Sequence, residues 1–365
     1  MPVRMGLPRL GLGGWRGLGA FWAVVLAATA GGAGVLGWLG PLPPPPGAPP
    51  PGAAPVAEAP MPGAGAEASA APAATPEPSP VQVVALQTPA RPARPGPIAE
   101  PALLENGPNG PLPRIGPDGR TSIRAYGRAF DRQDPRPRLG LVIGGLGMNA
   151  AVTEEAIGRL PGAIGLAFSP YAPRPERLLE QARGKGMEVL VALPLEPTGY
   201  PLNNPGDRAL LTGLSPSENG ERLLWALSRF PGYVGAIGAL GPMRGERFAQ
   251  LQESLGALQA TLQARGLLYL DPRPGAVKAP LRAWGRGIDL VVDEPATRSE
   301  IERKLAALEA LAKEHGAALG YAGEASPVLV DRVAAWAGSV EARGLVLAPV
   351  TALIRRPEQE GARGR

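Results

Sequence analysis

Short apolar runs alternate with helix-like segments over residues 138–355, and this alternation predicts most of the folded structure. Strands are predicted at 139–143, 163–168, 188–193, 233–237, 267–270, 288–292, 317–321 and 345–350. Helices are predicted near 150–160, 174–184, 216–229, 245–265, 298–314 and 326–342. Strands that alternate with helices indicate parallel βα units. About eight such strands predict an α/β domain, an irregular (distorted) parallel β/α barrel.

Helix boundaries carry signals of their own. Ser215 is followed three residues later by Glu218, which is the capping-box pattern at the start of a helix. Glycines follow predicted helices where a left-handed C′ residue is expected, at Gly184, Gly266, Gly316 and Gly344. These signals support the assigned boundaries.

The N-terminus has the pattern of a membrane segment. Residues 18–39 contain no charged side chain, and Arg4, Arg9 and Arg16 precede them. This length matches a bilayer-spanning helix, and the flanking arginines favour a cytoplasmic N-terminus. We therefore expect a cytoplasmic stretch at 1–17, a single-pass signal anchor in the inner membrane at 18–39, and a periplasmic domain. The alternative is a signal peptide cleaved after the small residues 28–30, which releases the domain into the periplasm.

Residues 40–137 are dominated by Pro, Ala and Gly, beginning with four consecutive prolines at 43–46. Such a stretch buries little apolar surface, so we expect a disordered linker. The folded domain is expected at 138–354, and a basic disordered tail at 355–365.

Composition excludes several kinds of site. The chain has no Cys and one His, so neither a Cys-ligated metal nor a site with two imidazoles can form within it. The net charge of +5 divides into +3 over residues 1–16 and +2 over 355–365, which leaves zero between them. Charge confined to the ends argues against nucleic-acid binding, which needs a concentrated basic surface.

Polar side chains follow the predicted strands, at the end of a β/α barrel where catalytic groups normally lie. The candidate cleft residues are Ser169, Glu196, Asp271, Arg273, Asp293, Glu294 and Tyr321. Their carboxylates suit a hard divalent cation, or an acid and base for glycoside cleavage. Asp271 and Arg273 equally suit a structural ion pair across the barrel mouth.

Several short motifs resemble those of divergent polysaccharide deacetylases of bacterial envelopes, relatives of the NodB-type deacetylases. The stretches that carry the resemblance are 166–173, 193–197, 211–216, 230–235, 265–271 and 347–350. Their order supports it from residue 138 to residue 353. The resemblance implies a distorted β/α barrel, a divalent metal ion and a carboxylate base.

The chain departs from this pattern where the resemblance places the base and the metal ligands. The positions that differ are Gly144, Gly145, Ala239, Pro242, Tyr321 and Ala322. Two glycines replace an Asp pair, and Ala239 and Tyr321 replace histidines. Asp271 is retained. The resemblance therefore implies that the metal site is lost, and we expect no cofactor.

Three functional hypotheses follow. The first is a catalytically degenerate domain that binds envelope polysaccharide, peptidoglycan, or a partner such as a cell-wall hydrolase or regulator. The second is an active carbohydrate deacetylase or hydrolase that uses Asp271 and Glu196 at the barrel mouth. The third is a purely structural element whose interactions lie in the linker and tail.

Overall fold

The computed structural model describes Trp22, residues 99–275 and residues 282–357. The expected N-terminal stretch, most of the linker and most of the basic tail lie outside these residues. Trp22 is the one described residue of the segment expected to cross the membrane. Within the described residues, no helix has the length and apolar character needed to span a bilayer.

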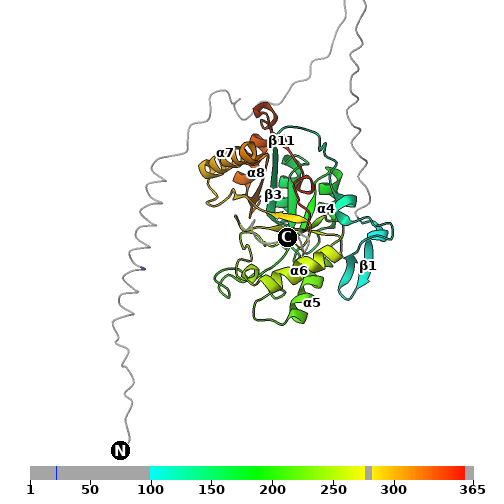
Figure 1. Cartoon of the computed structure of the whole chain (residues 1–365). Coiled ribbons are helices and arrows are strands. Elements are labelled where there is room, and N and C mark those ends of the chain that lie inside the picture. The colour runs from blue at the N-terminus through cyan, green and yellow to red at the C-terminus, as the bar shows by residue number, and fades with distance from the viewer. Residues whose placement is uncertain (1–21, 23–98, 276–281, 358–365) are drawn as a thin grey trace, which may run out of the picture. The chain divides into compact units, whose positions relative to one another are not determined.

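The domain is built on one sheet of parallel strands (Figure 1). Eight described strands follow one another in the order β8-β7-β6-β5-β4-β3-β10-β9, and β11 pairs with β3. The strands are β3 (Arg138–Leu146), β4 (Gly165–Phe168), β5 (Val189–Ala192), β6 (Gly235–Ile237), β7 (Leu268–Asp271), β8 (Gly285–Gly287), β9 (Leu290–Val291), β10 (Ala317–Ala322) and β11 (Val346–Leu347). The predicted α/β class is confirmed.

The two strands at the ends of this order, β8 and β9, belong to one short chain segment. Residues 284–288 bond to β7: the Tyr269 amide donates to the Trp284 carbonyl (2.8 Å), and the Ile288 amide to the Asp271 carbonyl (2.9 Å). The next residues bond to β10, with the Val292 amide 2.8 Å from the Tyr321 carbonyl oxygen. The strand predicted at 288–292 therefore corresponds to β9 alone, and β8 lies just before it, outside the predicted range. The sheet is a curled half-barrel rather than a regular barrel of paired strands.

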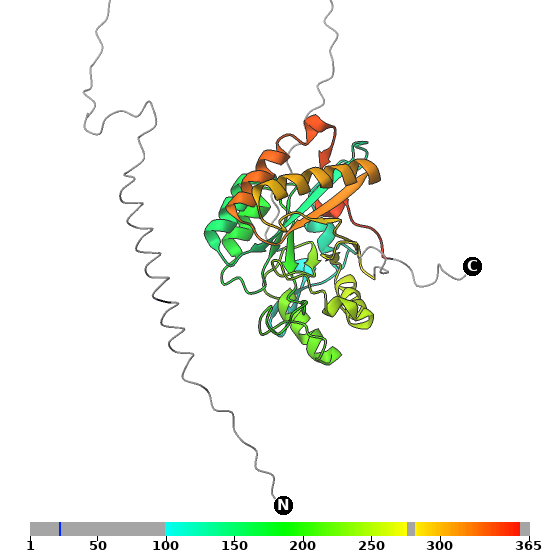
Figure 2. The ribbon, with the colours of Figure 1, turned by 90° about the vertical axis from the view of Figure 1, so that its left-hand side faces the viewer.

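Helices cover the outer face of the sheet, with α7 and α8 on one side of the domain and α5 and α6 on another (Figures 1 and 2). The helices are α3 (Ala150–Arg159), α4 (Glu176–Gly184), α5 (Pro216–Leu227), α6 (Gln252–Ala264), α7 (Arg298–His315) and α8 (Pro327–Ala337). The helix predicted at 245–265 is divided into the 3-10 turn η2 (Phe248–Gln250) and α6, and the one at 326–342 into α8 and η4 (Glu341–Arg343). The capping box at the start of α5 is confirmed, because Ser215 and Glu218 exchange hydrogen bonds.

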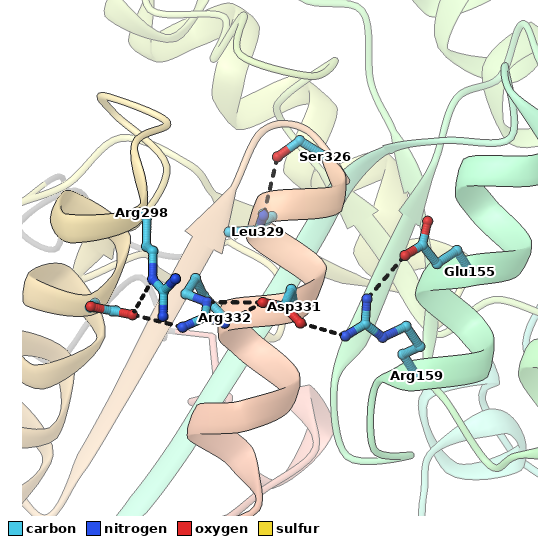
Figure 3. A network of polar contacts seen from close by, with 8 residues as sticks. Glu155, Arg159, Arg298, Ser326, Leu329, Asp331 and Arg332 are labelled. Carbon is cyan, nitrogen blue, oxygen red and sulfur yellow. Dashed lines mark hydrogen bonds and ion pairs between the residues drawn. The ribbon is translucent and has the colours of Figure 1, made fainter. Parts of the chain in front are cut away.

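Helices α3, α7 and α8 are linked by a chain of surface ion pairs (Figure 3). Asp331 on α8 accepts from Arg159 on α3 at 2.7 Å, and also from its neighbour Arg332. Arg332 in turn lies 2.9 Å from Glu302 on α7. The charges alternate along this chain, so each cation lies between anions.

The strands bury side chains on both faces, which explains their continuous apolar runs. On β5, Val189 and Val191 pack with the outer helices, whereas Leu190 and Ala192 point into the curl of the sheet. The inner group also contains Leu319 and Tyr321 of β10. The side chain of Tyr321 therefore lies inside the curled sheet, near its C-terminal end.

The expected linker ends earlier than residue 137. Residues 99–137 contain η1 (Pro101–Leu103), an antiparallel hairpin of β1 (Leu104–Gly107) and β2 (Gly110–Pro113), and α2 (Ser122–Tyr126). This part is ordered because its few apolar side chains are buried: Leu103 is 0% and Leu112 is 3% exposed. The high Pro and Gly content of this stretch is why the sequence did not indicate these buried apolar residues.

Candidate functional site

The space at the C-terminal end of β3 and β10 is filled by the side chain of Tyr321. Tyr321 is 0% exposed, and its hydroxyl donates a hydrogen bond to the Gly241 carbonyl at 2.6 Å. A Cβ atom on Gly144 would lie 2.5 Å from that hydroxyl and 3.0 Å from the Gly323 carbonyl oxygen. Burial raises the pKa of Tyr321, so the phenol stays protonated at neutral pH. A side chain at position 144 and this tyrosine therefore exclude each other.

A tight turn after β6 covers the same region. The Leu240 amide donates to the Met243 carbonyl at 2.8 Å, and the Met243 amide returns a bond of 3.2 Å. A Cβ atom on Gly323 would lie 2.9 Å from Pro242, so the turn packs closely on the end of β10. Ala239 and Ala322 beside it are 1% and 0% exposed.

Position 145 favours glycine because of its backbone conformation and because of its close neighbours. Its φ is +70°, a region that L side chains rarely adopt. A Cβ atom there would also lie 3.0 Å from the Gly323 carbonyl oxygen. Neither glycine at the end of β3 has room for an acidic side chain in this structure.

Asp271 at the end of β7 is paired with Arg273. The guanidinium Nε lies 2.9 Å from one carboxylate oxygen, and Nη2 lies 2.6 Å from the other. The Arg273 amide adds a third bond of 3.1 Å, and Nη1 reaches the Ala249 carbonyl at 3.3 Å. The bonds to Asp271 raise the pKa of Arg273. Both carboxylate oxygens of Asp271 are thus bonded to Arg273. This is the structural ion pair that was predicted as one of the alternatives for these two residues.

Glu196 fastens two loops together. Its side chain is 3% exposed; one carboxylate oxygen lies 3.0 Å from Arg247 Nε, and the other accepts from the Thr212 amide at 2.5 Å. The Glu196 carbonyl also accepts from the Phe248 amide at 3.1 Å. Sequence reasoning missed Arg247 and Thr212, because nothing in a linear pattern brings these loops to the end of β5.

Asp293 differs from the other carboxylates, because one of its oxygens has no partner. Oδ2 accepts from the Glu324 amide at 3.1 Å, whereas buried Oδ1 has no hydrogen bond within the described residues. Burial raises the pKa of Asp293 despite the opposing backbone hydrogen bonds, and the neighbouring Glu294 charge adds to the rise. Glu294 itself pairs with Arg244.

Three of the predicted cleft carboxylates pair with different arginines, whereas burial raises the pKa of Tyr321 and both Asp293 and Glu294 lie close enough for their charges to raise it further. Asp271 pairs with Arg273, Glu196 with Arg247, and Glu294 with Arg244, while the Ser169 hydroxyl only accepts from the nearby Tyr171 amide at 3.2 Å. Among the described residues, no three His, Cys, Asp or Glu side chains converge as a metal ion would require.

One further buried group lies beside Asp271 and was not foreseen. The Tyr269 hydroxyl on β7 has no hydrogen-bond partner among the described residues. A Cβ atom on Gly238 would lie 2.4 Å from it, so the glycine makes room for the phenol. Burial raises the pKa of Tyr269 well above its ordinary value, which keeps it neutral. In sequence it is simply an aromatic residue within an apolar strand.

Comparison with known proteins identifies the family. A family model described as divergent polysaccharide deacetylase matches residues 141–354. The chain belongs to this family. The crystal structure of the uncharacterized protein ATU2773 from Agrobacterium tumefaciens C58 is similar to this divergent polysaccharide deacetylase domain, with a TM-score of 0.62 and 32% sequence identity. The match covers 67% of this chain and 99% of that one. No curated protein matches.

The residues present do not fit the divalent ion that the deacetylase resemblance implies. At position 144 the acidic side chain is missing, and the Tyr321 hydroxyl fills its space. Ala239 offers no ligand atom, and retained Asp271 is bonded through both oxygens to Arg273. In this member of the divergent polysaccharide deacetylase family, these positions do not provide the ligand set that the resemblance implies.

Proposed function

We propose that the chain is a membrane-tethered envelope protein whose divergent polysaccharide deacetylase domain is catalytically degenerate and binds an envelope polysaccharide such as peptidoglycan. The observation that carries this proposal is the side chain of Tyr321. Its hydroxyl fills the space above Gly144 and is fixed by the Gly241 carbonyl.

Amide hydrolysis by a deacetylase needs a polarised carbonyl and an activated water molecule. A base near that water must have a carboxylate oxygen free to accept its proton. Asp271 and Glu196 have their oxygens engaged by Arg273, by Arg247 and by the Thr212 amide. Neither is therefore available as the base.

A ligand can still bind without reacting at the exposed side chains around the same end of the sheet, which we call the rim. The side chains of Arg247 and Glu294 are 55% and 45% exposed, although each already forms an ion pair. Arginine donors and carboxylate acceptors are the groups that bond sugar hydroxyls. We infer that this rim binds the glycan above the closed centre.

The test uses the full chain with insoluble peptidoglycan. We expect the protein to sediment with the glycan equally well with and without EDTA, and to release no acetate. Arg247→Ala should weaken the association, whereas Lys313→Ala, which removes an exposed charge from the last turn of α7 at the opposite end of the sheet, should not. Acetate release that disappears with EDTA would reject the degenerate interpretation. Equal sedimentation of both variants would reject the rim as the binding surface.

The tether is tested separately. We propose that residues 18–39 remain in the inner membrane and place the domain in the periplasm. Membrane fractions should retain the full-length chain after washing at high pH, and external protease should digest the domain once the outer membrane is opened. A shortened, freely soluble periplasmic product would favour signal cleavage near residues 28–30.

An active hydrolase is the second candidate, and Asp293 is the observation that favours it. Its buried, unpartnered Oδ1 and raised pKa are typical of a proton donor. Under this hypothesis the chain shortens or deacetylates an envelope glycan, and Asp293→Asn abolishes the reaction without unfolding the protein. Product formation that persists in Asp293→Asn would exclude this role.

A further inference from the structure

A cavity of about 790 Å³ lies at the N-terminal end of the sheet, away from the strand ends discussed above. Its walls include Gly266 and Trp284, which shortly precede β7 and β8, and Phe130, which precedes β3. Thr351 of the 3-10 turn η5 (Val350–Ala352) closes another side. This volume is within the range of small-molecule sites.

The lining of this cavity is strongly cationic. Arg124, Arg128, Arg132 and Arg356 contribute to it, and no Asp or Glu does. None of the four forms an ion pair within the part of the chain that the structure describes. Elsewhere in the domain most arginines lie beside carboxylates, as in the network of Figure 3. Four uncompensated guanidinium groups around one cavity produce a positive potential that favours an anion.

The existing contacts hold three of these arginines in place and leave the fourth available. Arg128 Nη1 donates to the Gly186 carbonyl at 3.1 Å, and Arg132 Nη2 to the Thr351 carbonyl at 3.1 Å. The Arg356 guanidinium lies 5.7 Å from the centre of the Trp284 ring. The side chain of Arg124 has no hydrogen bond or ion pair among the described residues. Each guanidinium has five donors, so those with backbone bonds retain free N–H groups.

The buried carboxylate behind this wall is already satisfied. Glu188 is 1% exposed and accepts from the Arg128 amide at 2.9 Å, from the Thr351 amide at 3.0 Å and from the Thr351 hydroxyl. Its carboxylate oxygens therefore accept from backbone amides and a hydroxyl, and they do not pair with the guanidinium groups of the four arginines.

Beside Thr121, Gln263 and Thr351, the lining also has a large apolar part. Ile115, Ile123, Phe130, Trp284 and Ile354 contribute aliphatic and aromatic surface, and Ile115 is 42% exposed despite its size. We propose that this cavity binds an organic anion, in which a phosphate or carboxylate group lies among the arginines and an apolar or ring-shaped body lies against the isoleucines and Trp284. Such a molecule is either a soluble metabolite or a membrane lipid, and both present the same chemistry to the cavity.

The test is calorimetric titration of the full chain with hexyl phosphate, beside inorganic phosphate and hexanol as the two halves of that probe. We expect one site per chain, with hexyl phosphate binding more tightly than either half. Arg124→Gln should weaken binding about tenfold, the effect of one lost charge-assisted hydrogen bond. Arg174→Gln is the matched control, because it removes one exposed arginine outside the cavity and should change nothing. Ala129→Trp, which fills the rim of the cavity, should abolish binding.

Two further titrations distinguish the source of the anion. A lipid ligand predicts that vesicles containing phosphatidylglycerol compete with hexyl phosphate, while phosphatidylcholine vesicles do not. A soluble ligand predicts competition by glucose 6-phosphate and none by either vesicle. Binding that is equal for hexanol and hexyl phosphate, or unchanged in both Arg124→Gln and Ala129→Trp, would overturn the proposal.

Discussion

Replacing Gly144 by Ala tests whether Tyr321 closes the end of the sheet. The new Cβ would lie 2.5 Å from the Tyr321 hydroxyl, far inside an ordinary contact. The hydroxyl would have to move by roughly 1 Å to restore a normal separation. It is held by a 2.6 Å hydrogen bond in a fully buried position, so it has little freedom to move. Overpacking of this kind costs about 1–3 kcal/mol, and we expect Gly144→Ala to lower the free energy of unfolding by about 2 kcal/mol.

Tyr321→Phe supplies the second arm of a double-mutant cycle. Alone it leaves the Gly241 carbonyl without its partner, which costs about 1–3 kcal/mol. It also removes the atom that collides with a Cβ at position 144, after which the nearest neighbours lie at 3.0 and 3.2 Å. The double variant should therefore be more stable than the sum of the two losses predicts, by about 1 kcal/mol or more.

The assay is urea unfolding of all four proteins by far-ultraviolet circular dichroism, with free energies extrapolated to water. Gly220→Ala is the control for glycine replacement as such, because a Cβ there meets nothing within 4 Å. Additivity of the two losses to within about 0.5 kcal/mol would refute the contact between positions 144 and 321. So would a Gly144→Ala variant as stable as the parent.

Three other outcomes follow from the structure. Gly220→Ala, in the interior of α5, should raise the free energy of unfolding by about 0.5–1 kcal/mol, which the same urea titration measures. The raised pKa of Asp293 means that the folded state binds its proton more tightly than the unfolded state does. The free energy of unfolding therefore falls as the pH rises from the unfolded-state pKa of this group to its folded-state pKa. Asp293→Asn should therefore gain stability relative to the parent as the pH rises above about 4, and a difference that is constant with pH would contradict this. Asp331→Asn should lower the urea midpoint slightly in low salt, and the loss should vanish in about 1 M NaCl, since its ion pairs lie at the surface.

The fold could be predicted as far as its strands are apolar. Strands buried on both faces are visible as runs, and β3, β5 and β10 lie where the sequence indicated. β8 was missed because its residues are Gly285, Arg286 and Gly287. A Cβ on Gly285 would lie 1.9 Å from the Tyr269 carbonyl oxygen, so close backbone packing selects glycine there instead of an apolar side chain.

The candidate site could be predicted only where partners are close in sequence. Asp271 and Arg273 lie two residues apart, and their ion pair was foreseen as one of two interpretations. The partners of Glu196 come from other loops, and the arginine-lined cavity combines residues from 115 to 356. Contacts of that range depend on the closure of the whole sheet, which no local pattern records.

The chain segment that joins β7 to β10 also affects how copies of this protein can meet. An exposed strand edge is a template onto which a second chain can add a strand, and it is a common start of aggregation. Here β8 and β9 are short, and Gly285 already exchanges backbone hydrogen bonds with Arg355 at 3.1 and 2.8 Å. The described sheet therefore offers little edge for a second copy to extend, so association between copies would have to use side-chain surfaces.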